Sequence, residues 1–154
     1  MPEIMKTITL TNVSIYRSIA EEAHQKMHES LVAGRRPRPD GGWIIKYDPT
    51  RTSFKQALIA IAFTGMWLEA ATHLAIVREY GLDTAKESDR KFYEDKLQLL
   101  GRSDRTLIER AKRLQLARRE LMHEKACFGR GEVRAAQEEA ENAHKLLIEL
   151  RDLV

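Results

Sequence analysis

SFKQALIAIAFTGMWLEAATHLAIVREY, residues 53–80, contains the most apolar stretch of the chain, residues 57–77. It is apolar on most of its faces, which is typical of a helix at the centre of a bundle. Ser53 is the predicted N-cap and Gly81 the predicted C-cap. Residues 57–77 are also long enough to cross a bilayer, but a charge near the bilayer centre costs about 3 kcal/mol and Glu69 falls inside them. We therefore expect a central core helix and no membrane span.

Most of the remaining chain also has the pattern of helices. With only 8 Gly and 4 Pro in 154 residues, the apolar periodicity of its long segments favours helix over strand. We expect a single soluble domain, residues 1–154, with an all-α, up-and-down bundle of four to five helices. Thr84 and Glu87 match a capping box at the start of the third helix. The predicted helices span about residues 14–33, 53–80, 84–100, 103–128 and 132–153.

The last predicted helix has the most regular apolar pattern. Its apolar residues are spaced alternately by three and four, which is typical of a seam packed against another helix. The partner could be a helix of the same chain or of a second subunit. The seam consists of Val133, Ala136, Ala140, Ala143, Leu147, Leu150 and Val154.

A long basic connection, residues 34–52, follows the first predicted helix. It carries five basic and two acidic residues, a net charge of +3. It is either a solvated loop or a basic arm that meets phosphate, with Trp43 and Tyr47 as stacking groups. Residues 7–10, in the N-terminal segment 1–13, alternate like a short strand and could pair with residues 43–45 as a small hairpin.

The charges of the chain are unevenly distributed. The total is 26 basic and 23 acidic residues, a net charge of +3 that is too balanced for a disordered polycation. Residues 102–130, however, hold nine basic and four acidic residues, and residues 131–154 hold three basic and six acidic ones. A basic helix beside an acidic one is either an internal charge pairing or a phosphate-facing surface.

Arg118 and His123 are the candidate catalytic residues. Arg118 lies in the apolar stripe between Leu114 and Leu121, where a charge needs a partner or a water-filled groove. An Arg can hold a phosphate and a His can move a proton near neutral pH, which together suit phosphodiester cleavage. Residues five apart on an ideal helix point about 140° apart, so Arg119 shares a face with His123 more naturally than Arg118 does.

The run Arg118-x4-His123 near the end of a long helix, followed by a glycine break and an alanine-rich last helix, resembles the HEPN superfamily. The resemblance covers about residues 53–154 and implies an all-helical, usually dimeric bundle. Many members are metal-independent endoribonucleases with a composite site between two subunits. The resemblance implies that Arg118 contacts the scissile phosphate and that His123 activates the ribose 2′-hydroxyl or protonates the leaving group. Where the family often has Asn, Asp or His after the Arg, this chain has Arg119.

The leading hypothesis is therefore a metal-independent endoribonuclease of a toxin or defence system. A second hypothesis is a non-catalytic HEPN-like module that binds nucleotide, RNA or a protein, and a third is a helical scaffold in which Arg118 and His123 are structural. The expected partners are a second copy of the chain, RNA and a nucleotidyltransferase-like antitoxin. With one cysteine, Cys127, and no signal peptide visible in the first six residues, we expect a cytoplasmic protein.

The other candidate residues are mostly expected to be structural. Glu69 could neutralise Arg118, pair with His73 four residues on, or lie exposed at a dimer interface, and a structural role is favoured for it. Arg119 is a further candidate for phosphate contact. His24 and His28 have a spacing that could hold zinc, or they lie on a solvated face. Cys127 and His144 have no evident partner. No motif for a metal or cofactor is found, so neither is predicted.

Overall fold

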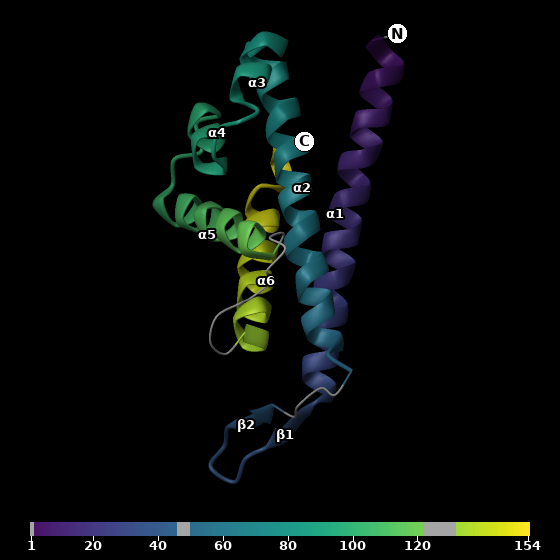
Figure 1. Ribbon diagram of the computed structural model, residues 1–154, viewed down its shortest axis with the longest axis vertical. Coiled ribbons are helices and arrows are strands. Elements are labelled where there is room, and N and C mark those ends of the chain that lie inside the picture. Colours follow the sequence, from purple (N-terminus) through teal and green to yellow (C-terminus); the bar gives the residue numbers. More distant parts are fainter. Residues whose placement is uncertain (1, 46–49, 122–131) are drawn as a thin grey trace.

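The computed structural model describes residues 2–45, 50–121 and 132–154, and most of these residues are helical (Figure 1). The predicted all-α fold class is confirmed. The described residues form six α-helices, because the third predicted helix is divided in two. The helices are α1 (Pro2–Ala33), α2 (Thr52–Tyr80), α3 (Leu82–Ser88), α4 (Tyr93–Leu99), α5 (Arg105–Leu121) and α6 (Glu132–Glu149). A 3₁₀ turn, Arg151–Leu153, follows α6, and a small hairpin of β1 (Arg35–Pro37) and β2 (Trp43–Ile45) follows α1.

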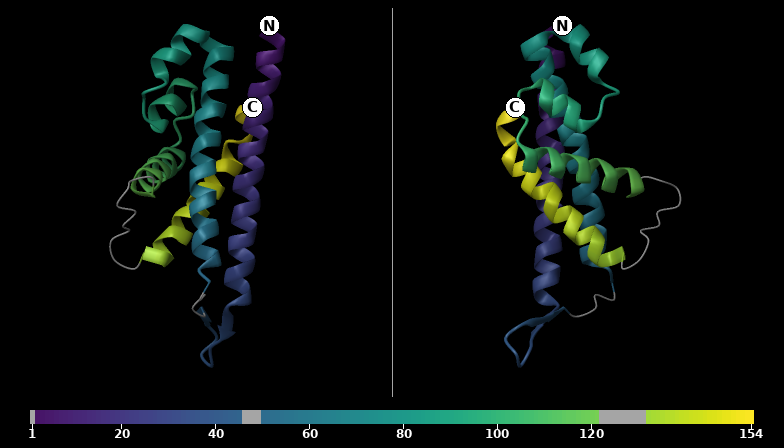
Figure 2. Two further views of the ribbon diagram at one scale, coloured as in Figure 1. Left: turned by 45° about the vertical axis from the view of Figure 1, so that its right-hand side comes forward. Right: turned by 90° about the vertical axis from the view of Figure 1, so that its left-hand side faces the viewer.

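The apolar helix α2 is central, as its sequence predicts. It packs along α1 on one side and against α5 and α6 on the other (Figures 1 and 2). Ile61, Trp67, Leu68 and Ile76 are almost wholly buried there. Among the described residues, α2 is the one helix long and apolar enough to span a membrane, and 56% of its most apolar window is buried within the protein.

The start of α2 differs from the prediction, whereas its end agrees. Ser53 lies inside the helix and is 3% exposed, and its hydroxyl accepts a hydrogen bond from Gln137 of α6 at 2.6 Å. The N-cap position belongs to Arg51, which adopts a left-handed conformation (φ 55°, ψ 31°). Gly81 ends the helix at φ 90° as predicted, and its N–H donates to the carbonyl of Val77 at 3.0 Å. Ser53 therefore joins two helices instead of capping one.

The hairpin predicted between residues 7–10 and 43–45 is wrong. Residues 7–10 are part of α1, since a four-residue alternation does not outweigh the extension of a long helix. The strand β2 pairs instead with β1, antiparallel, with Arg36 opposite Ile44. A turn closes the hairpin, in which Arg38 N–H donates to the carbonyl of Gly42 at 2.8 Å. Tyr47 lies outside the described residues.

The third predicted helix is interrupted after Ser88. Thr84 is inside α3 and its hydroxyl donates to the carbonyl of Tyr80 at 3.3 Å, so the predicted capping box is wrong. After the turn at residues 89–92, α4 begins at Tyr93 and packs against α2 and α5. This interruption gives one wall of the cleft described below.

The helices α5 and α6 differ in how they pack against α2. The helix α6 packs against α2, α5 and α1 of the same chain, and its predicted seam residues Ala136, Ala140, Ala143 and Leu147 are fully buried. The helix α5 crosses α2 and α6 instead of running along them (Figures 1 and 2), so the arrangement is not a simple up-and-down bundle. The crossing turns the last part of α5 toward the middle of α2.

Candidate functional site

Arg118 lies near the end of α5 and extends its side chain across α2. Its neighbours Leu114 and Ala117 are buried against the core, and the Arg118 side chain itself is only 21% exposed. At the crossing point α2 has Gly65. A Cβ added to Gly65 would lie 2.5 Å from Cδ of Arg118 and 3.0 Å from its Nε, so no larger residue fits without a shift. Gly65 therefore provides the space in which Arg118 lies.

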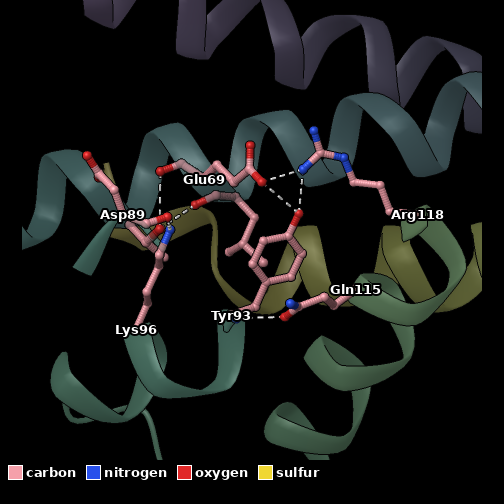
Figure 3. A network of polar contacts seen from close by, with 8 residues as sticks. Glu69, Asp89, Tyr93, Lys96, Gln115 and Arg118 are labelled. Carbon is pink, nitrogen blue, oxygen red and sulfur yellow. Dashed lines mark hydrogen bonds and ion pairs between the residues drawn. The ribbon is translucent and has the colours of Figure 1, made fainter. Parts of the chain in front are cut away.

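The Arg118 guanidinium is held by Glu69 of α2 and Tyr93 of α4, which point toward it (Figure 3). Its Nη1 donates to Glu69 Oε1 at 2.5 Å and to the Tyr93 hydroxyl at 2.6 Å. The Tyr93 hydroxyl donates in turn to the same oxygen of Glu69 at 3.2 Å. Of the alternatives for Glu69, the structure thus shows the pairing with Arg118, and the three groups form a closed triangle from three helices.

Burial and charge alter the acid–base properties of this triangle. Burial, and next the negative charge of Glu69, raise the pKa of Tyr93 to about 12, so its hydroxyl stays protonated at neutral pH. Burial opposes the charged form of Arg118, but its hydrogen bonds to Tyr93 and Glu69 and the negative charge of Glu69 outweigh burial and raise the Arg118 pKa. Arg118 is therefore a permanent cation, and Tyr93 a permanent donor to Glu69.

Tyr93 is fixed in place by both its backbone and its ring. It is the first residue of α4 and only 4% exposed. Its N–H donates to Oε1 of Gln115 on α5 at 2.8 Å, which satisfies one of the free amides at the start of the helix. Tyr93 thus joins α4 to α5 through the backbone and to α2 through the hydroxyl.

These residues lie at a cleft of about 670 Å³ that is open to solvent. One wall is the turn between α3 and α4 with the first residues of α4, the other is α5, and Glu69 of α2 lies between them. The lining holds six basic and three acidic residues, a net charge of +3. The basic residues are Arg90, Lys91, Lys96, Lys112, Arg118 and Arg119, and the acidic ones are Glu69, Asp89 and Glu94.

Each acidic residue of the lining lies beside a basic side chain. Glu69 is bound by Arg118, Glu94 lies 3.3 Å from Lys112, and Asp89 lies 3.1 Å from His73. After these pairings, three exposed lining cations have no acidic partner among the described residues: Arg90, Lys91 and Arg119. An anionic ligand would meet these free charges first.

Lys96 is the most enclosed cation of the cleft, with 5% of the residue exposed. Its ammonium donates to the backbone carbonyl of Asp89 at 3.4 Å, as Figure 3 shows. Burial lowers the pKa of Lys96, and the nearby charges of Glu69 and Asp89 partly offset that effect. Lys96 thus bonds to the backbone of the turn at Asp89, whereas Lys91 and Arg119 are exposed to solvent.

Three of the predicted site residues lie at this one cleft. Arg118, Arg119 and Glu69 all line the same cleft, whereas His123 and Cys127 lie outside the described residues. The alternative Glu69–His73 pair is not formed, because His73 Nδ1 faces Asp89 at 3.1 Å.

A cluster at the contact of α1 and α6 was not expected from the sequence. His24 and His144 stack with ring centroids 3.7 Å apart and 5° between their planes, and His24 Nε2 lies 2.7 Å from Glu141 Oε1. His144 therefore has a partner, contrary to the prediction, and His24 faces α6 while His28 is exposed. In the part of the chain that the structure describes, no group of three or more His, Cys, Asp or Glu side chains could hold a metal ion.

Sequence reasoning also missed Gly65, Tyr93 and Gln115. The one available signal was Gly65 itself, since an isolated glycine inside a helix costs stability and often marks a close contact. Tyr93 meets Gln115 and Arg118 of α5 only through the docking of α4, which no local pattern indicates.

Arg118 has two guanidinium nitrogens outside its contacts with Glu69 and Tyr93. Both contacts of Arg118 use Nη1, and Nε and Nη2 make no hydrogen bond to a described residue. A planar guanidinium with such remaining donors suits a phosphate. No protein-family model, no curated protein and no solved structure matches this chain. Its function is therefore inferred from the chemistry of the cleft.

Proposed function

We propose that the cleft binds the phosphodiester backbone of RNA and that the chain is a HEPN-like, metal-independent endoribonuclease. In this proposal Arg118 holds the scissile phosphate and His123 transfers a proton to or from the reacting oxygens. The carrying observation is that Arg118 is fixed by Glu69 and Tyr93 at an open basic cleft while two of its nitrogens remain free of described partners.

The charge of the cleft supports a polyanion as the ligand. Three exposed cations without acidic partners among the described residues, Arg90, Lys91 and Arg119, line the same cleft as the Arg118 guanidinium. Phosphate contacts by Lys and Arg supply most of the affinity of non-specific nucleic-acid binding. One Arg held by two partners, among exposed cations without acidic partners, combines orientation at one phosphate with attraction to the neighbouring phosphates.

A non-catalytic HEPN-like module that binds RNA is the second candidate. It is favoured by the position of Glu69, whose carboxylate is bound to Arg118 and would lie close to any phosphate held there. A negative charge next to a bound phosphate opposes the gain of further charge during cleavage. This module would bind RNA through the same cations and leave it intact.

The remaining features of the proposal concern partners and location. A second copy of the chain would complete a composite site, and a nucleotidyltransferase-like antitoxin would restrain the enzyme in a cytoplasmic toxin or defence system. In this scheme the basic connection 34–52 would be a secondary RNA contact, with Arg35, Arg36 and Arg38 exposed on it.

Cleavage of labelled RNA in the presence of EDTA tests the catalytic proposal. The full chain is compared with His123→Ala and with a matched control, His28→Ala, whose side chain is exposed on α1. We expect cleavage by the wild type and by His28→Ala, and a loss of at least 100-fold in His123→Ala, in line with general acid–base catalysis. Equal cleavage by the wild type and His123→Ala would exclude His123 as a catalytic residue.

Binding of a 2′-O-methyl RNA, which cannot react at the 2′-oxygen, tests the cleft separately from cleavage. Arg119→Gln removes a cleft charge without breaking a contact between described residues, and Arg105→Gln removes an exposed charge at the other end of α5, about 20 Å away. We expect Arg119→Gln alone to weaken binding and to lower the salt slope by about one. Equal effects of the two variants would contradict binding at the cleft.

A further inference from the structure

Two exposed apolar side chains lie among the cations of the cleft. Phe92 is 59% exposed and Leu116 is 56% exposed, and both belong to the lining. Exposed apolar groups are common singly, but two of them on one charged cleft form a surface with a mixed character. A ligand of this cleft would therefore offer an apolar face as well as negative charge.

Phe92 is exposed although the next residue is buried. Tyr93, with 4% exposed, docks α4 against the protein, whereas Phe92 precedes the helix in an extended conformation (φ −65°, ψ 155°). The Phe92 ring is therefore not part of the hydrophobic core. Arg90 and Lys91, directly before it, are exposed cations of the same wall.

The opposite wall repeats this combination. Lys112, Leu116 and Arg119 are four and three residues apart, so they lie on one face of α5, and all three line the cleft. Apolar groups thus lie among cations on both walls.

We propose that the cleft takes single-stranded RNA, with one base stacked on Phe92 and the neighbouring phosphates at Lys91 and Arg119. This inference rests on the RNA-binding function proposed above and specifies the form of RNA. An aromatic ring within a basic groove is the combination that binds single strands, because each base offers a flat face to the ring. In a duplex those faces are covered by neighbouring bases, so the ring would gain nothing. An acidic peptide would match the charges but offers such a face only where it carries an aromatic side chain, whereas every nucleotide of a single strand carries a base.

Four ligands distinguish stacking of a base from binding of the backbone alone, of a duplex or of a single nucleotide. They are a single-stranded 2′-O-methyl RNA of about 12 nucleotides, a strand of equal length without bases, the matching duplex and a mononucleotide. The affinity of the full chain is compared with those of Phe92→Leu, Phe92→Tyr and Tyr80→Leu. Tyr80 is 50% exposed and does not line the cleft, so it is the matched control. A 2-aminopurine in the strand reports stacking by the loss of its fluorescence.

We expect Phe92→Leu to weaken binding of the single strand about 5-fold or more and to leave binding of the baseless strand unchanged. Phe92→Tyr and Tyr80→Leu should bind like the wild type, and quenching of 2-aminopurine should be lost only in Phe92→Leu. An unchanged affinity of Phe92→Leu for the single strand would overturn the stacking assignment and leave RNA binding intact. Equal affinity of the wild type for the duplex and the single strand would also overturn the stacking assignment. A mononucleotide that binds as tightly as the strand would overturn the assignment of a strand as the ligand. If the wild type binds none of the four, RNA binding itself is wrong.

Discussion

Gly65 and Arg118, on crossing helices, approach so closely that a single methyl group on Gly65 would lie 2.5 Å from Arg118 Cδ. Gly65→Ala has two opposite consequences. Alanine favours the helix by about 1 kcal/mol, but its Cβ displaces a side chain whose end is fixed by Glu69 and Tyr93. We expect the unfolding free energy to change by less than about 1 kcal/mol and the affinity for 2′-O-methyl RNA to fall about 10-fold.

A double-mutant cycle isolates this contact. In an Arg118→Ala background the two nearest obstacles are absent and only the Tyr93 hydroxyl, 3.2 Å from the added Cβ, remains close, so Gly65→Ala should be more favourable than in the wild type, by up to about 1 kcal/mol. Chemical denaturation of the four proteins measures the difference. Equal effects of Gly65→Ala in both backgrounds would show that Arg118 does not occupy this space.

Tyr93→Phe removes the hydroxyl that completes the triangle but keeps the ring. Because this buried hydroxyl is bonded to one cation and one anion, we expect a loss of about 1–3 kcal/mol in unfolding free energy. Urea denaturation measures this loss. Tyr80→Phe is the matched control, since its hydroxyl donates to a backbone carbonyl at the surface, and its loss should be below about 1 kcal/mol.

The stacked His24–His144 pair makes stability depend on pH. Burial, and next the neighbouring His24, lower the pKa of His144, although Glu141 and Glu21 oppose this shift. Because the unfolded chain has a His144 pKa near 6.5, the stabilisation is complete above about pH 6.5 and is lost as the pH falls through the folded-state pKa. The urea midpoint of the wild type should thus fall more between about pH 7.5 and 5.5 than that of His144→Gln. His28→Gln, which alters an exposed residue of α1, should show the same fall in urea midpoint as the wild type. If the midpoint of His144→Gln falls as much as that of the wild type, His144 is not the source of the pH dependence.

Leu147 and Ile148, adjacent on α6, test its packing. Leu147 is fully buried and Ile148 is 43% exposed. Leu147→Ala should cost about 2–5 kcal/mol because it leaves a cavity, whereas Ile148→Ala should cost less than about 1 kcal/mol. Thermal or urea unfolding of the two variants measures the difference, and similar costs would mean that the register of α6 differs from the one described.

The parts of the fold that depend on local spacing were predictable. The α6 residues Ala136, Ala140 and Ala143 are buried because a helix repeats its face every three to four residues, which the sequence itself displays. Gly81 ends α2 because only glycine adopts its left-handed φ easily. Glu69 could be proposed as one possible partner of Arg118 because a charge at the edge of an apolar stripe requires a partner.

The parts that depend on docking were not predictable. Tyr93 and Arg118 are 25 residues apart, and they meet only because the chain turns after Ser88 and lets α4 pack under α5. His24 and Glu141 are 117 residues apart, on helices at opposite ends of the chain. Such contacts follow from the arrangement of helices in space, which single-sequence periodicity does not encode.

The hairpin of β1 and β2 lies at one end of the molecule, away from α3 and α4 (Figure 1). Its turn at Asp40 and Gly41 is exposed and is closed by its own backbone hydrogen bonds. A fluorophore or surface tether attached at Asp40 would therefore leave the cleft accessible. The hairpin thus provides a handle by which the protein can be immobilised, with the Arg118 side exposed to any RNA that flows past.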